Sequence, residues 1–108
     1  IKKFKKSIKK FDSLFSATAI QGHYWDYKTK PINHNPFEKK HIVKSKLKPL
    51  FSQNGGIFIR YKKDMIKDGR FIGNKPMIFS MNEIDGWDLD DPWQLEVARL
   101  LVKFNYVK

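Results

Sequence analysis

The stretch QNGGIFIRYKKDMIKDGRFIGNKPMIFSM, residues 53–81, carries the signals that decide the fold class. It predicts, in order, a turn at 54–56, a strand over 57–61, a short helix over 62–68 and a second strand over 75–81. Gly55 and Gly56 can take the positive φ of a tight turn, and Gly69 can end the helix in the same way. Strands that alternate with helices along a chain indicate an α/β protein.

The flanking sequence adds elements of the same two kinds. We expect an amphipathic helix over 1–11, a strand over 12–20, a short strand over 87–90 and a final helix over 92–104. Asp91 stands where the last helix needs an N-cap, Pro92 where its first residue belongs, and Gln94 completes a capping box. The apolar side chains of this helix recur at helical spacing, and we expect them to be buried: Trp93, Val97, Leu100, Leu101 and Phe104.

Composition limits the chain to one globular domain, 1–108. Its 108 residues are 41% hydrophobic and 15% aromatic, which favours a packed core over disorder. No apolar run is long enough to span a membrane, and no signal-peptide pattern is present. The absence of cysteine excludes disulfides and thiolate metal sites and fits a reducing compartment, so we expect a cytoplasmic protein with no membrane partner.

The net charge of +11 is unevenly distributed. Residues 1–50 hold 13 of the 22 Lys and Arg residues and only three acids, so this half carries +10 and the other half +1. A basic surface of this size attracts nucleic acid, nucleotide phosphates and anionic lipid alike, and charge alone does not choose among them.

Five carboxylates and no basic residue lie between Glu83 and Asp91. Asp91 is explained by the helix that it caps. If residues 87–90 are extended, Asp88 and Asp90 share a face about 6–7 Å apart while Leu89 faces the core. Two carboxylates at that separation can converge on one hard cation, and the helix N-terminus that follows also favours negative charge. The pair therefore predicts a Mg²⁺ site, although the motif Asp-x-Asp is weak by itself.

Five stretches taken together resemble one family, the acylneuraminate cytidylyltransferases or CMP-sialic acid synthetases. They are, in order, DSLFSATAI, KPINHNPF, PLFSQNGGIFI, RFIGNKPMIFSM and WDLDDPWQLEVARLL, and they run from Phe11 to about Leu101. The resemblance implies a three-layer α/β nucleotidyltransferase fold of the Rossmann-like kind, with a mixed sheet and flanking helices. It also implies the transfer of CMP from CTP to a nonulosonic (sialic-type) sugar acid, with release of pyrophosphate.

The same resemblance implies roles for single residues. Asp88 and Asp90 match the family's catalytic and metal-binding pair for Mg²⁺. Phe58 matches the aromatic residue that lies against the sugar, and Phe71 and Ile72 match the apolar pair that walls the sugar pocket. A basic residue upstream of the Asn-Gly strand, often arginine, is most nearly matched by Lys44. Residues 22–50 match an extended segment that reaches onto the partner of a homodimer.

The family's glycine- and arginine-containing loop for the CTP phosphates has no counterpart in this sequence. We therefore expect the C-terminal half of such an enzyme, inactive alone. Two alternatives stay open: a small basic module that binds single-stranded nucleic acid through aromatic residues interleaved with lysines, and an inactive structural remnant of the enzyme. The sequence does not choose the sugar acid, the number of metal ions or the oligomeric state.

Overall fold

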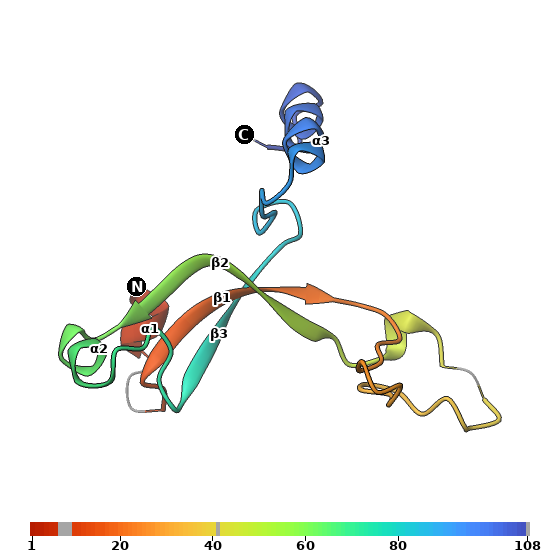
Figure 1. The fold of residues 1–108 in the computed structure, drawn as a ribbon, viewed down its shortest axis with the longest axis horizontal. Helices are drawn as coiled ribbons and strands as arrows, with labels where there is room; N and C mark the ends of the chain where they lie inside the picture. Colours follow the sequence, from red (N-terminus) through yellow and green to blue (C-terminus); the bar gives the residue numbers. More distant parts are fainter. Residues whose placement is uncertain (7–9, 41, 108) are drawn as a thin grey trace. The chain divides into compact units, whose positions relative to one another are not determined.

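The computed structural model describes residues 1–6, 10–40 and 42–107 (Figure 1). Its chain forms two compact units, one of Ile1–Thr18 with Gln53–Lys108 and one of Ala19–Ser52. The helices and strands are α1 (Lys2–Lys6), β1 (Ser13–Ile20), the 3₁₀ helix η1 (Lys44–Lys46), β2 (Leu50–Arg60), α2 (Lys62–Asp68), β3 (Pro76–Met81) and α3 (Pro92–Lys103). The predicted α/β class is confirmed at this level: a small mixed sheet with flanking helices.

The sheet has three strands in the order β2-β1-β3, so β1 lies between the other two (Figure 1). β1 and β3 are parallel, in a register that pairs Ser13 with Pro76 and Thr18 with Met81. β2 completes a mixed sheet along the other edge of β1. The chain between β2 and β3 must therefore cross the end of β1, and α2 lies in this crossover.

The turn expected at 54–56 is wrong, because these residues lie inside β2. Asn54 holds this part of the strand against β1: its Oδ1 accepts a 2.5 Å hydrogen bond from Ser16, and its Nδ2 donates to Thr18 Oγ1 at 3.2 Å. Gly55 has a φ of 72°, which glycine adopts without steric cost, so the strand continues through an irregular residue. A side chain that bonds across the sheet outweighs the turn preference of the local sequence.

The helix expected over 1–11 is described only in part. α1 covers Lys2–Lys6, residues 7–9 lie outside the described part of the chain, and Lys10 is in a turn. Phe4 is 4% exposed, and its ring centroid lies 6.1 Å from that of Tyr61. The lysines of α1 are exposed, so this helix follows the expected division between an apolar and a basic side.

Two helix ends are formed as the sequence predicts. Gly69 ends α2 in the left-handed conformation, with a φ of 67°, and its amide donates to the carbonyl of Met65 at 2.7 Å. Asp91 begins α3 with Gln94 in a capping box, in which the amide of Asp91 donates to Gln94 Oε1 at 2.7 Å. Both ends follow from local chemistry alone.

Two expectations about the C-terminal region are wrong. Residues 87–90 form no strand, and Leu89 is 53% exposed instead of facing the core. The apolar stripe of α3 is not buried either: Trp93 is 58% exposed and Phe104 63% exposed. The buried apolar side chains among the described residues lie outside α3; they are Phe4, Leu14, Ala17 and Leu47.

The second unit, Ala19–Ser52, is built mainly from turns. Asp26 Oδ1 accepts hydrogen bonds from the amides of Lys28 and Lys30, which closes the loop between the bridged residues Trp25 and Pro31. The side chain of Asn33 ties this loop to the backbone of Gly22. Among the described residues, no helix has the length and apolarity that crossing a membrane requires.

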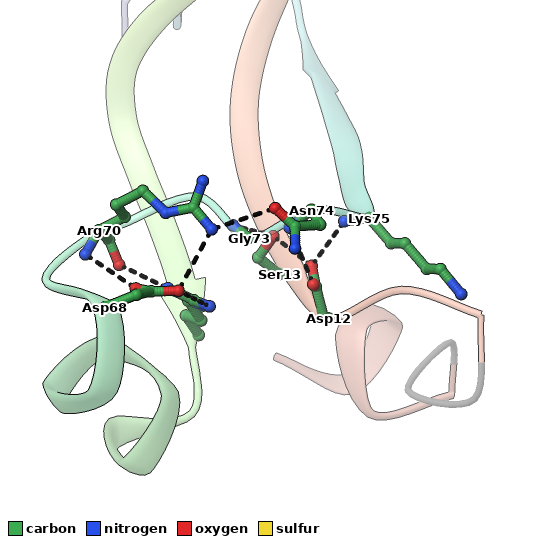
Figure 2. Close-up of polar contacts among 8 residues, drawn as sticks. Asp12, Ser13, Asp68, Arg70, Gly73, Asn74 and Lys75 are labelled. Carbon is green, nitrogen blue, oxygen red and sulfur yellow. Dashed lines mark hydrogen bonds and ion pairs between the residues drawn. The ribbon is translucent and has the colours of Figure 1, made fainter.

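The crossover from α2 to β3 is held by the residues that begin β1 (Figure 2). Ser13 Oγ accepts a 3.0 Å hydrogen bond from the amide of Gly73, and the Asp12 carboxylate accepts bonds of 3.0 and 3.1 Å from the amides of Asn74 and Lys75. Gly73 is buried so close to Asp12 that a Cβ there would overlap the carboxylate. The crossover therefore requires a residue without a side chain at this position.

Gly73→Ala is expected to lower the free energy of unfolding by about 1–3 kcal/mol, the usual cost of inserting a methyl group where none fits. The measurement is denaturant unfolding of the single variant, of Asp12→Ala and of the double variant. Because Asp12→Ala removes the carboxylate that the new methyl group meets, Gly73→Ala should cost less in that background. Additive effects in the double variant would contradict this contact.

Candidate functional site

Phe58 and Phe71, which the resemblance assigns to one sugar pocket, lie side by side. Phe58 is in β2 and Phe71 follows α2, yet their ring centroids are 5.6 Å apart with an interplanar angle of 32°. Phe58 is 36% exposed and Phe71 66% exposed, so the pair remains accessible to a ligand. Ile72, the other residue predicted for this wall, is half-buried. We call Phe58 and Phe71 the aromatic pair.

Arg60 fixes the start of the loop that carries Phe71. Its guanidinium donates two hydrogen bonds to the Asp68 carboxylate, at 2.5 and 2.7 Å, and a third to the carbonyl of Arg70 at 2.9 Å. The side chain of Arg60 is only 7% exposed, although it lies at the end of β2. A two-pronged bond of this kind fixes both distance and orientation, so the chain on either side of Gly69 is held against β2.

The aromatic pair therefore stands on a loop that is fixed at both ends. Arg60 holds residues 68–70 before Phe71. Asp12 and Ser13 hold residues 73–75 after it, as Figure 2 shows. The side chain of Arg70 adds a link between the two ends, because its Nη2 donates to Asp68 at 3.2 Å and to Asn74 at 3.1 Å. A loop held in this way presents its aromatic residue in one position.

These contacts change the pKa values of three groups. The hydrogen bonds from Arg60 hold the pKa of Asp68 well below its ordinary value of 3.8; partial burial opposes this effect and Arg70 reinforces it. The bond with Asp68 in turn raises the pKa of the Arg60 guanidinium. Partial burial by itself would raise the pKa of Asp12, but hydrogen bonds from Ser13 and from the amides of Lys75 and Asn74 outweigh it, so this pKa is also lowered.

Asp88 and Asp90 lie in the irregular segment before α3, where both are exposed. Their extended arrangement was expected from a strand that the structure does not form. Within the described residues, neither carboxylate takes part in a hydrogen bond or ion pair. The backbone of Asp90 is fixed nonetheless, because its amide donates to Gln94 Oε1 at 2.7 Å.

The described residues contain no group of three or more His, Asp and Glu side chains that could hold a metal ion. By themselves, Asp88 and Asp90 would supply only part of a donor set for Mg²⁺. Their chemistry still suits this ion, which is commonly held by one or two carboxylates while water and substrate phosphates fill the remaining positions.

Lys44 belongs to the other compact unit, Ala19–Ser52, in which it begins η1 and is exposed. A cavity of about 210 Å³ in that unit does not include Lys44 in its lining, which is formed by His23, Trp25, His34, Asn35, Pro36, Glu38, Lys40 and Ile42. Among the residues predicted for the sugar site, the structure thus brings together Phe58 and Phe71.

The ionic contacts around Asp68 were not predicted from the sequence. Arg60, Asp68 and Arg70 stand at spacings that match no motif, and each is an ordinary residue at the end of an element. One signal was available: Arg60 follows the apolar run Ile57–Ile59 of a strand, where a charged side chain needs a partner. The sequence also did not predict that the turn after β3 packs closely against β1. A Cβ at Gly86 in this turn would overlap Thr18 Oγ1.

No protein-family model matches the chain, and no curated protein sequence matches it.

The lowered pKa of Asp68 predicts an acid-sensitive contribution to stability. A carboxylate whose pKa is lower in the folded than in the unfolded state contributes its full stabilisation above the unfolded value of 3.8, and this is lost as pH falls through the folded value. Asp68→Asn should therefore have a lower Tm at pH 7 and a shallower fall of Tm between about pH 5 and pH 2.

Glu96→Gln is the matched control, because Glu96 is 68% exposed and pairs only with Arg99 within α3. Its Tm should follow the wild-type curve closely, as expected for an exposed ion pair. Equal pH dependence of Tm in the wild type and in Asp68→Asn would contradict the assignment of this effect to Asp68.

Proposed function

We propose that this chain is the C-terminal part of a cytidylyltransferase that transfers CMP from CTP to a nonulosonic, sialic-type sugar acid. In this reaction the anomeric hydroxyl oxygen of the sugar acid attacks the α-phosphorus of CTP. The bond to the β-phosphate oxygen breaks, pyrophosphate leaves and the hydroxyl proton is released. The three-stranded mixed sheet would be part of the larger central sheet of a three-layer nucleotidyltransferase fold.

The observation that carries the proposal is the aromatic pair. Phe58 and Phe71 come from different elements and are 13 positions apart, so chain connectivity does not make them neighbours. The resemblance assigns both to one sugar-binding wall. Exposed aromatic rings held at a fixed position suit the apolar side of a sugar ring, which packs on aromatic surface while its hydroxyl groups meet polar groups.

The remaining predicted residues have roles in this proposal that follow from their chemistry. Asp88 and Asp90 would hold Mg²⁺, which neutralises phosphate charge during nucleotidyl transfer. Lys44, exposed in the unit Ala19–Ser52, would meet an anionic group of CTP or of the sugar acid. The same unit contains the proposed dimerisation segment, residues 22–50. We propose a cytoplasmic homodimer that needs the nucleotide-binding half for activity.

Complementation tests the proposed reaction. The chain is incubated with CTP, Mg²⁺ and a panel of nonulosonic acids, alone and with the N-terminal half of a cytidylyltransferase, and CMP-sugar is measured. Activity is expected only in the complemented mixture, and Asp88→Ala or Asp90→Ala should reduce it by about a hundredfold or more. Full activity in both variants would rule out the metal assignment, and no activity with any half would favour the inactive remnant.

Removing either ring of the aromatic pair is expected to weaken sugar-acid binding. Phe58→Ala and Phe71→Ala should each raise the Kd for the sugar acid by about tenfold, the effect of losing roughly 1–1.5 kcal/mol of aromatic contact. Phe104→Ala serves as the control, because Phe104 is similarly exposed but lies at the end of α3. A Kd that changes equally in all three variants would show that the pair has no specific role.

A second candidate function is binding of single-stranded nucleic acid by the unit Ala19–Ser52. Tyr27 is 91% exposed and Phe37 84% exposed, and Lys28 lies over the Tyr27 ring at 5.6 Å from its centroid. Exposed rings among lysines are the usual surface on which bases stack.

This candidate predicts that oligonucleotide affinity falls steeply with salt and that Tyr27→Ala weakens binding by about fivefold or more. Fluorescence anisotropy with a labelled single strand at several salt concentrations measures both effects. Affinity that is absent, or independent of salt, excludes this function.

A further inference from the structure

The side chain of Arg70 is oriented but not buried. Its Nη2 donates to Asp68 Oδ2 at 3.2 Å and to Asn74 Oδ1 at 3.1 Å, and its backbone amide donates to Asp68 Oδ1 at 3.1 Å (Figure 2). The side chain is nevertheless 52% exposed. Among the described residues, its Nη1 and Nε have no hydrogen-bond partner. Arg70 therefore presents part of its guanidinium to solvent from a fixed position.

The charge of Arg70 is left uncompensated within this cluster. Asp68 accepts two short hydrogen bonds from the buried guanidinium of Arg60, which neutralises its charge, whereas the contact from Arg70 is longer. Arg60, Asp68 and Arg70 together carry a net charge of +1, and the carboxylates of Asp64 and Asp12 also act on Arg60. An exposed guanidinium with unused N–H groups is the side chain best suited to a carboxylate, which it binds through two parallel hydrogen bonds.

The aromatic pair and this guanidinium belong to the same region of the molecule. Phe58 and Arg60 are two residues apart in β2, so their side chains leave the same face of the sheet. Arg70 directly precedes Phe71 and contacts the carboxylate that Arg60 binds. One loop thus carries both an apolar ring and an oriented cation, the two kinds of group that bind a ring with a carboxylate.

We infer that Arg70 binds the carboxylate of the sugar acid whose ring packs on Phe58 and Phe71. This inference rests on the proposed function and names the group that selects an acid over a neutral sugar. Arg60 does not fill this role, because its side chain is 7% exposed and its Nη1 and Nη2 already donate to Asp68 and to the carbonyl of Arg70. Arg60 and Asp68 act as positioning residues for Arg70.

The test compares two probes that share a ring and differ in charge: N-acetylneuraminic acid and its methyl ester. Their Kd values are measured on the full chain by ligand-observed NMR titration, for the wild type, Arg70→Gln and Arg99→Gln. The wild type should bind the acid about tenfold more tightly than the ester. Arg70→Gln should remove this preference: its Kd for the acid should rise about tenfold, and its Kd for the ester should stay unchanged.

Arg99→Gln is the matched control, because Arg99 is also an exposed arginine paired with one carboxylate, at 66% exposure on α3. It should keep the preference for the acid. Arg70→Lys retains a cation but loses the two-pronged geometry, so its preference should lie between those of the wild type and Arg70→Gln. This second variant decides the matter if Arg70→Gln fails to fold.

Each result decides a different claim. If both probes bind and Arg70→Gln keeps the full preference for the acid, the inference is overturned and sugar binding by the aromatic pair stands. If the wild type binds the acid and the ester equally, the inference is overturned as well. If the wild type binds neither probe, the inference is overturned, and the complementation assay with the panel of nonulosonic acids decides the proposed function separately.

Discussion

The hydrogen bonds at the start of β1 set the arrangement on which the other features depend. A chain that leaves β2 on one edge of the sheet and enters β3 on the other must pass the end of β1, where its backbone amides need acceptors. Ser13 and Asp12 supply acceptors for three consecutive amides, those of residues 73–75. The pairing of Ser13 with Pro76 follows directly, so one short segment sets both the crossover and the parallel register.

The Arg60–Asp68 pair has a different part in the same crossover. It ties the end of α2 back to the strand from which the chain came, and it does so with a guanidinium that is almost fully buried. Burying a charge is costly unless its partner and its hydrogen bonds are in place, so this pair specifies one position for residues 68–70 more than it adds net stability. The result is that Phe71 packs beside Phe58 instead of moving with a free loop.

Local chemistry was sufficient where a single residue decides the backbone, as at Gly69 and at the Asp91 cap of α3. Local chemistry did not predict the backbone where contacts with residues far away in the sequence determine it, as at Asn54. Asn-Gly-Gly favours a turn by itself, but hydrogen bonds to Ser16 and Thr18, far away in the sequence, keep it in β2. In the candidate site Phe58 and Phe71 lie side by side, and the salt bridge that holds the loop of Phe71 corresponds to no sequence motif.

The two parts of the proposed site differ in how strongly the chain organises them. The aromatic pair is fixed by hydrogen bonds on both sides, so it is formed before any ligand binds. The carboxylates of Asp88 and Asp90 make no hydrogen bonds within the described residues, and the cap of α3 fixes the backbone at Asp90 and Asp91. On the proposed function this difference has a physical reason. A rigid aromatic surface reduces the entropy lost when a sugar ring binds, whereas carboxylates brought close together without a cation repel each other. The metal and the nucleotide phosphates would therefore organise the two aspartates as they bind.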